Sequence, residues 1–115
     1  LINIVLMTKE DEIILGGSVF GKDNCRIVNI FGYELDFRPE GHMLFLQNQD
    51  VPGVIGKVGM VLSGANVNIG EYLLSRNPSK DRAYSVIKVD EQINSELIDQ
   101  LIQLDEILSI KQLII

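Results

Sequence analysis

Two side chains suited to holding a small polar molecule lie where a strand pattern gives way to a helix pattern, and a third is expected across the sheet. Asn48 and Asp50 end an alternating run, so both point to the same side of the predicted strand. Asn68 begins the next strand-like run and is expected across the same sheet. One carboxylate and two amides offer the acceptors and donors that a ligand's ammonium and hydroxyl groups require. The set predicts an amino-acid pocket.

A helix N-terminus is predicted beside these side chains. From Gly53 to Ala65 apolar residues recur at three and four positions, and Pro52 suits the first turn. Such an end carries about half a positive charge and unpaired N–H groups, so it can hold a carboxylate or a phosphate. Gly53 and Gly56 would let a small anion come close. The structural alternative, in which Asp50 caps the helix and the asparagines form turns, stays open.

The residue pattern gives little support to catalysis or metal binding. The segment Gly56-Lys57-Val58-Gly59 lacks the Ser or Thr that must follow the lysine of a phosphate-binding loop. The chain has one His and one Cys, too few for a zinc site, and no catalytic triad can be drawn around His42. We expect His42 to be an exposed hinge residue and Cys25 a half-buried thiol. No catalytic residue, metal site or cofactor site is predicted in this chain.

Charge and composition limit the partners. A net charge of −6 opposes binding to nucleic acid, and no apolar run approaches the roughly 20 residues that span a membrane. The single cysteine fits a reducing cytoplasm. Arg26, Arg38 and Lys88 make an anion site conceivable, although most single surface bases are simply solvated. Because the chain opens at Leu1 directly into an apolar run, we expect it to be a piece of a longer protein.

The first 41 residues are predicted to be mostly strand. Short β-branched or aromatic runs are separated by Gly, Asp and Asn, and Phe31-Gly32-Tyr33 suits a tight hairpin turn. A boundary is predicted at Pro39-Glu40-Gly41, which gives domains 1–41 and 42–115. The strand runs are residues 2–7, 12–15, 18–20, 26–31 and 33–37.

The second domain reads as βαββαβ. Asn94 is an N-cap with Glu96 in the first turn, followed by apolar residues at helical spacing. The predicted fold class is α+β, a ferredoxin-like unit with two helices on one face of four antiparallel strands, preceded by the mostly β partial domain. The predicted strands are residues 42–49, 67–75, 83–89 and 107–115.

The open face of this sheet predicts self-association. Met43 and Phe45 are expected to face away from the helices, and the final Ile-rich strand presents an edge. Apolar side chains and unpaired backbone would remain in water unless another chain covers them. A homo-oligomer is therefore expected.

Several segments of the chain resemble those of a known family. Residues 50–59 followed by residues 66–69 are similar to the ACT domain, an amino-acid-sensing βαββαβ module. Further segments resemble the C-terminal region of long-form D-3-phosphoglycerate dehydrogenases, namely residues 16–21, 26–30, 39–44, 85–90 and 104–110. The first domain would then be part of the intervening, or allosteric substrate-binding, domain of that family.

The resemblance implies a role in L-serine biosynthesis. L-serine, or another small amino acid, would bind between two ACT domains as a feedback effector, held by Asn48, Asp50 and Asn68. The backbone around Pro52, Gly53, Val54 and Ile55 would meet its carboxylate, while Arg26, Arg38 and Lys88 would serve a phosphorylated effector. Catalysis with NAD would belong to N-terminal domains of the same protein. The regulatory end of an L-serine dehydratase, and a dimerisation module without ligand, are the alternatives.

Overall fold

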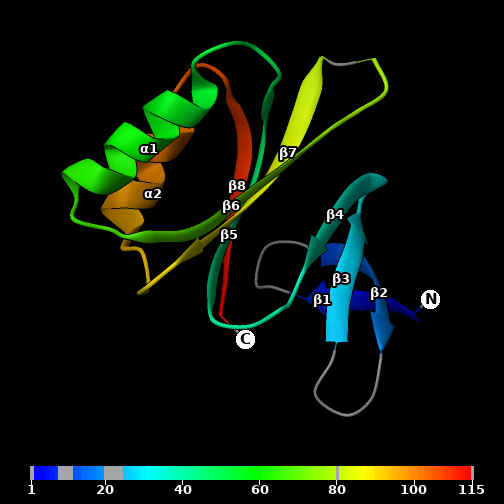
Figure 1. The fold of residues 1–115 in the computed structure, drawn as a ribbon. Coiled ribbons are helices and arrows are strands. Elements are labelled where there is room, and N and C mark those ends of the chain that lie inside the picture. The colour runs from blue at the N-terminus through cyan, green and yellow to red at the C-terminus, as the bar shows by residue number, and fades with distance from the viewer. Residues whose placement is uncertain (1, 8–11, 20–24, 80, 115) are drawn as a thin grey trace. The chain divides into compact units, whose positions relative to one another are not determined.

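The computed structural model shows one four-stranded sheet in the first part of the chain and a second sheet with two helices in the other (Figure 1). It describes residues 2–7, 12–19, 25–79 and 81–114, with side chains from Arg26 onward. The chain divides into two units, Leu1–Pro39 and Glu40–Ile115. This division lies two residues before the end of the first predicted domain, residues 1–41. The assignment of that domain to the intervening domain of the family stays a prediction.

The first unit is an antiparallel meander. Its strands pair in chain order, β1-β2-β3-β4, so the prediction of a mostly β half is confirmed. The predicted runs 12–15 and 18–20 belong to one strand that continues through Gly16 and Gly17, where its register with β3 shifts. Residue 20 lies outside the described residues. The strands are β1 (Ile2–Met7), β2 (Glu12–Val19), β3 (Cys25–Ile30) and β4 (Tyr33–Phe37).

The predicted hairpin turn joins β3 to β4. Phe31 and Gly32 have φ values of 50° and 87°, the positive values that a two-residue turn between right-twisted strands requires. Asn29 Oδ1 accepts a hydrogen bond from the Gly32 backbone N–H at 3.0 Å, which holds the turn closed.

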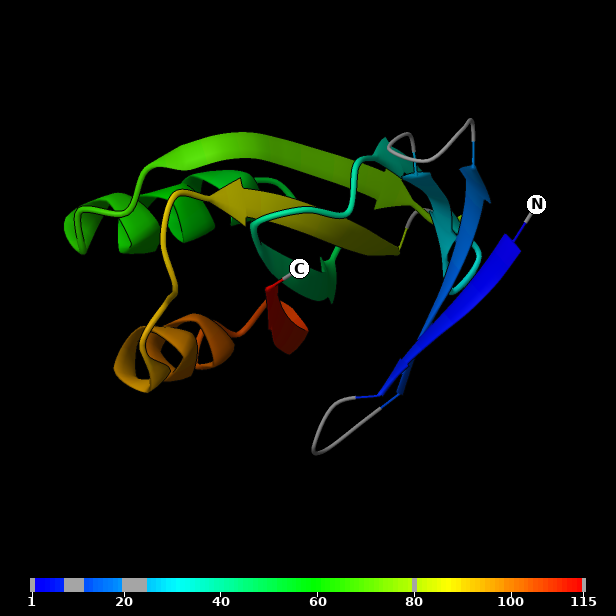
Figure 2. The same ribbon diagram turned by 90° about the horizontal axis from the view of Figure 1, so that it is seen from below.

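The second unit has the predicted βαββαβ order. Its strands pair as β6-β7-β5-β8, with neighbouring strands antiparallel, and both helices lie on one face of the sheet (Figure 2). Since β5 and β6 are both antiparallel to β7, they run in the same direction. The elements are β5 (His42–Gln49), α1 (Val54–Gly64), β6 (Ile69–Arg76), β7 (Arg82–Val89), α2 (Ser95–Ile102) and β8 (Ile107–Ile114).

One apolar core lies between the helices and the sheet. Val54, Val58 and Leu62 form the buried stripe of α1, as the spacing predicts. Leu97 and Leu101 form that of α2. Ala65 is an exposed C-cap residue, so the predicted helix is one residue too long at that end. Because α2 contacts α1 and β8, α1 covers the half of the sheet that contains β6 (Figure 2).

Two predictions about β5 are wrong. Met43 and Phe45 are 0% and 1% exposed, so they supply no open apolar face. Their strand is central, and Phe45 is flanked by Val86 on β7 and Lys111 on β8. His42 is a half-buried residue of this strand and not an exposed hinge. Exposed large apolar side chains lie elsewhere on the unit, at Val51, Ile55, Met60, Ile69, Ile102, Leu108 and Ile114.

The helices are short. No helix in the described part of the chain has the length and hydropathy needed to cross a membrane.

Candidate functional site

A cavity of about 460 Å³ opens where β5 ends and α1 begins. Its wall joins the segment before α1 to the last residues of β6. Six of the seven residues expected to hold an amino acid line it. The lining residues are Asn48, Asp50, Val51, Pro52, Gly53, Val54, Ile55, Leu74 and Arg76.

The N-terminus of α1 is open toward this cavity. Gly53 is the N-cap residue with a φ of 91°, and no described side chain caps the helix. The first turn contains no acidic residue, and the first helical hydrogen bond runs from the Lys57 N–H to the Gly53 carbonyl at 3.0 Å. Pro52 and Gly53 therefore precede the helix, contrary to the predicted first-turn position. The partial positive charge of the helix is left for another group to neutralise.

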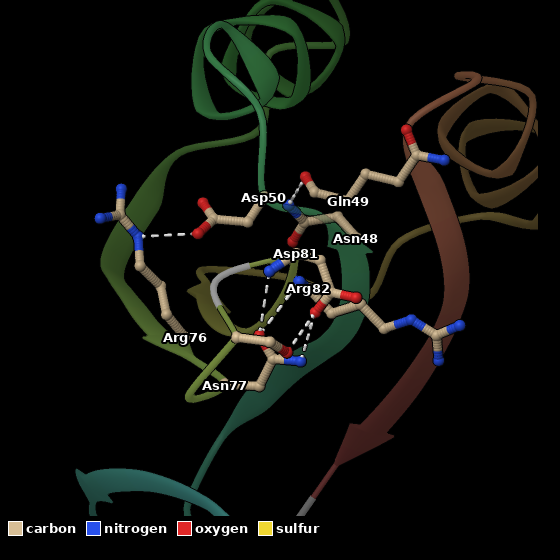
Figure 3. Close-up of polar contacts among 8 residues, drawn as sticks. Asn48, Gln49, Asp50, Arg76, Asn77, Asp81 and Arg82 are labelled. Carbon is tan, nitrogen blue, oxygen red and sulfur yellow. Dashed lines mark hydrogen bonds and ion pairs between the residues drawn. The ribbon is translucent and has the colours of Figure 1, made fainter.

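Asp50 does not cap α1. Its carboxylate Oδ2 pairs with Arg76 Nε at 3.2 Å, as Figure 3 shows. The side chain of Asp50 is 14% exposed, whereas that of Arg76 is 59% exposed. The Asp50 backbone N–H donates to the Asp81 carbonyl at 3.0 Å. The simple alternative, in which Asp50 serves the helix end, is thus wrong, and the cavity contains a largely buried carboxylate paired with a largely exposed guanidinium.

Asn48 lines the same cavity and has a buried, unsatisfied amide oxygen. The residue is 2% exposed, and its Nδ2 donates to the Gln49 carbonyl at 2.8 Å. Its Oδ1 is buried without a hydrogen-bond partner among the described residues. A buried acceptor in this condition costs about 1–3 kcal/mol, which a bound donor would recover.

The loop between β6 and β7 supports Asp50. Asn77 Oδ1 accepts from the backbone N–H groups of Asp81 and Arg82 at 3.1 and 3.2 Å (Figure 3). Asp81 Oδ1 accepts from Asn77 Nδ2 at 2.6 Å and from Ser79 Oγ at 2.9 Å. These two hydrogen bonds hold the pKa of the Asp81 carboxyl below its usual value. The network fixes the Asp81 carbonyl that receives the Asp50 amide.

A second contact ties α1 to the opposite edge of the sheet. Lys57 Nζ donates to Glu106 Oε1 at 2.5 Å, and the Gln49 backbone N–H donates to the Glu106 carbonyl at 2.8 Å. The hydrogen bond from Lys57 lowers the pKa of the Glu106 carboxyl. The end of β5, the first turn of α1 and the segment before β8 are therefore held together.

Asn68 is not brought to this cavity within one chain. It precedes β6, while Arg76 ends that strand, and its carbonyl accepts from the Asp90 backbone N–H at 3.3 Å. A strand advances about 3.3 Å per residue, so Asn68 and Arg76 are roughly 25 Å apart. Because β5 and β6 run in the same direction, Asp50 lies at the Arg76 end.

The three predicted anion-binding bases are divided between the two units. Arg26 and Arg38 belong to the first unit and Lys88 to the second. Arg26 Nε pairs with Asp36 Oδ1 at 2.6 Å, and Lys88 Nζ lies 4.0 Å from Glu71 Oε1. Arg26 and Lys88 thus already have carboxylate partners, and the anion-binding role of all three bases stays a prediction.

Arg76 is the charged cavity residue that sequence reasoning missed, together with the apolar Val51 and Leu74. The strand directions could have predicted the position of Arg76. Two strands that run in the same direction end at the same end of the sheet. Asp50 follows β5 and Arg76 closes β6, so this direction makes an acid and a base neighbours.

Fold and site together define a ferredoxin-like α+β unit with an open helix N-terminus facing a charged cavity. No family model matches the chain. It is 34% identical over 86 residues to the D-3-phosphoglycerate dehydrogenase of Bacillus subtilis, a match of 75% of this chain and 16% of the relative. It is 30% identical over 110 residues to that of Archaeoglobus fulgidus, covering 94% and 21%. A chloroplastic relative from Arabidopsis thaliana is 29% identical over 91 residues, covering 78% and 14%.

The chain belongs to the D-3-phosphoglycerate dehydrogenase family, as a C-terminal region of that enzyme. The resemblance of the sequence to the C-terminal region of D-3-phosphoglycerate dehydrogenases is thereby confirmed. The chain spans about a fifth or less of the length of these relatives.

Proposed function

We propose that this chain is the regulatory region of a D-3-phosphoglycerate dehydrogenase and that its second unit is an ACT domain that binds L-serine as a feedback effector. The observation that carries the proposal is the cavity at the start of α1. It combines uncapped helix N–H groups, the carboxylate of Asp50 and the unpartnered oxygen of Asn48. Among the described residues, no side chain caps these N–H groups and none bonds the Asn48 oxygen.

An α-amino acid matches the chemistry of this cavity. Its carboxylate would accept from the backbone N–H groups around Gly53 and Val54, where the helix dipole favours negative charge. Its ammonium would donate to Asp50. The unpartnered Oδ1 of Asn48 would accept from the ammonium or from the hydroxyl of serine.

Asn68 would come from a second copy of the chain. β6 is an edge strand of its sheet, so its outer N–H and C=O groups can pair with another strand. Antiparallel pairing of β6 with its copy, centred on Tyr72, would set Asn68 of one chain opposite Arg76 of the other. Each cavity would then be completed across the interface, and the dimer would contain two equivalent sites.

Exposed apolar residues favour this edge. Ile55 and Met60 of α1 are 52% and 77% exposed, and Ile69 begins β6 with 37% exposure. α1 covers the β6 half of the sheet, so these side chains would be covered as two β6 edges pair (Figure 2). Their burial would stabilise the dimer at about 25 cal/mol per Å² of apolar surface removed from water.

Catalysis would lie in other domains of the whole enzyme, which would use NAD to oxidise its substrate. A ligand that binds between two copies changes the preferred position of one copy relative to the other. The free energy of serine binding would thereby shift the enzyme between more and less active arrangements.

The test is calorimetric titration of the full-length enzyme with L-serine, with glycine, L-phenylalanine and 3-phosphoglycerate as comparisons. We expect saturable serine binding and its loss in Asn68→Ala, with Gln100→Ala on the exposed surface of α2 as the amide control. The Asn68 variant should also keep its mass in solution if the effect is on the ligand. Absence of serine binding by the unaltered enzyme would contradict the proposal.

A further inference from the structure

We infer that Asp50 and Arg76 form a displaceable ion pair that makes the cavity select zwitterions, with Arg76 leaving Asp50 to bind the ligand carboxylate. The inference rests on the proposed function, because it concerns the same cavity, and it adds a specificity-determining residue. Both side chains line the cavity and meet at 3.2 Å.

The two partners differ in how firmly they are held. Asp50 is 14% exposed, and its backbone N–H is bonded to the Asp81 carbonyl, so its carboxylate is largely enclosed and its backbone is held. Arg76 is 59% exposed and ends a strand. A guanidinium carries five N–H donors. In Arg76 the Nε atom lies 3.2 Å from Asp50 Oδ2. Arg76 is therefore the partner that can turn toward a ligand.

An exchange of partners sets the ligand class. A simple anion would attract Arg76 and the α1 N-terminus but would leave Asp50 unpaired beside a second negative charge. A simple amine would pair with Asp50 but would leave Arg76 and the helix N–H groups without an anionic partner. Leaving a partly buried charge without its partner is costly, so only a molecule that carries both charges replaces the pair without loss.

Surrounding groups are arranged for that exchange. The uncapped first turn of α1 faces the same space, so the carboxylate would be held by both a guanidinium and backbone N–H groups. The carboxylate would thus gain two kinds of partner, and the ammonium would take the place of Arg76 at Asp50.

The experiment uses the full-length enzyme and three ligands of similar size. L-serine carries both charges, L-serinamide lacks the carboxylate charge, and L-glycerate carries a hydroxyl in place of the ammonium. By titration calorimetry we expect the unaltered enzyme to bind L-serine about 100-fold more tightly than L-serinamide at this site. Arg76→Gln should lower the affinity for L-serine by tenfold or more and change the affinity for L-serinamide by no more than about twofold. The preference of the enzyme for L-serine over L-serinamide would therefore be largely lost. Asp50→Asn should lower the preference for L-serine over L-glycerate in the same manner.

The control is Arg82→Gln, an exposed arginine of β7 that does not line the cavity and whose side chain is directed away from Asp50 (Figure 3). It should leave all three affinities unchanged. L-serine binding that is unchanged or tighter in Arg76→Gln would overturn the inference and leave the proposed function standing. Failure of the unaltered enzyme to bind L-serine would overturn both.

Discussion

The two helices of the second unit begin in opposite ways. α2 starts after Asn94, whose Oδ1 accepts from the Leu97 backbone N–H at 2.9 Å, and Glu96 lies in its first turn. α1 starts after Gly53, with neither a capping side chain nor an acid in its first turn. A capping residue contributes about 1 kcal/mol, so α1 forgoes a local stabilisation that α2 has.

The surroundings of the two helix starts differ in the same sense. In front of α2, Gln112 accepts from the Ile93 backbone N–H at 2.7 Å and donates to the Ile93 carbonyl at 3.0 Å. Both backbone groups of Ile93 are therefore paired. In front of α1 lie the cavity, an ion pair and an unpartnered amide oxygen. The comparison shows that one unit can close one helix end with internal hydrogen bonds and leave the other open toward a cavity.

The largest expected effect comes from giving α1 the acid that α2 possesses. Ile55→Glu places a carboxylate in the first turn, where it would interact favourably with the helix dipole and repel a ligand carboxylate. We expect L-serine affinity in the full-length enzyme to fall at least tenfold, or about 1.4 kcal/mol. The mass in solution separates repulsion of the ligand from loss of the proposed dimer, whose interface would cover Ile55. Glu96→Gln is the matched control, and it should leave serine affinity unaltered.

The second effect tests the backbone of the open end. At Gly53 an added Cβ would meet no atom within 4 Å, but the φ of 91° is unfavourable for a side chain. Gly53→Ala should therefore cost about 1–2 kcal/mol of unfolding free energy, measured by urea denaturation. Gly59→Ala, in open space within α1, should instead be neutral or stabilising. Equal losses in the two variants would mean that the conformation of Gly53 is not what matters.

The third effect opens the closed end. Asn94→Ala removes the cap of α2 and should cost about 1 kcal/mol of unfolding free energy, with no change in serine affinity. A loss of serine affinity comparable to that of Ile55→Glu would contradict the division of roles between the two helices. Denaturant unfolding and calorimetry on the same preparation measure both quantities.

The smallest effect concerns the loop that supports Asp50. Hydrogen bonds from Asn77 and Ser79 lower the pKa of Asp81, so they add stability above the ordinary pKa of 3.8 that is lost as the pH falls through the lower folded value. The stability difference between the unaltered protein and Ser79→Ala should be constant near neutral pH and vanish in acid. A difference that persists in acid would assign the effect of Ser79 to another contact.

Local signals in the sequence predicted what is local in the structure. The N-cap at Asn94, the turn at Gly32 and the βαββαβ order follow from residue type and periodicity, and the structure has all three. The positions of Asn68 and Arg76 depend on which strands run in the same direction and on which ends meet. No short segment of the sequence determines either position. For this reason the sequence predicts Asn68 at the cavity and does not predict Arg76 there.

The burial of Met43 and Phe45 has the same origin. Alternation predicts which face of a strand a side chain occupies, but it does not predict whether that face is covered. β5 lies between β7 and β8, so its side chains have neighbours on both sides, and that central place depends on the last strand of the unit.

The order of the strands also sets an order of folding during synthesis. In the first unit every strand pairs with the one made just before it, so the meander can form progressively as the chain emerges from the ribosome. In the second unit β5 is made first but needs β8, which is made last, on one of its sides. The nascent second sheet therefore keeps an unpaired edge at β5 until translation has passed β8, the interval in which a chaperone would be expected to engage it.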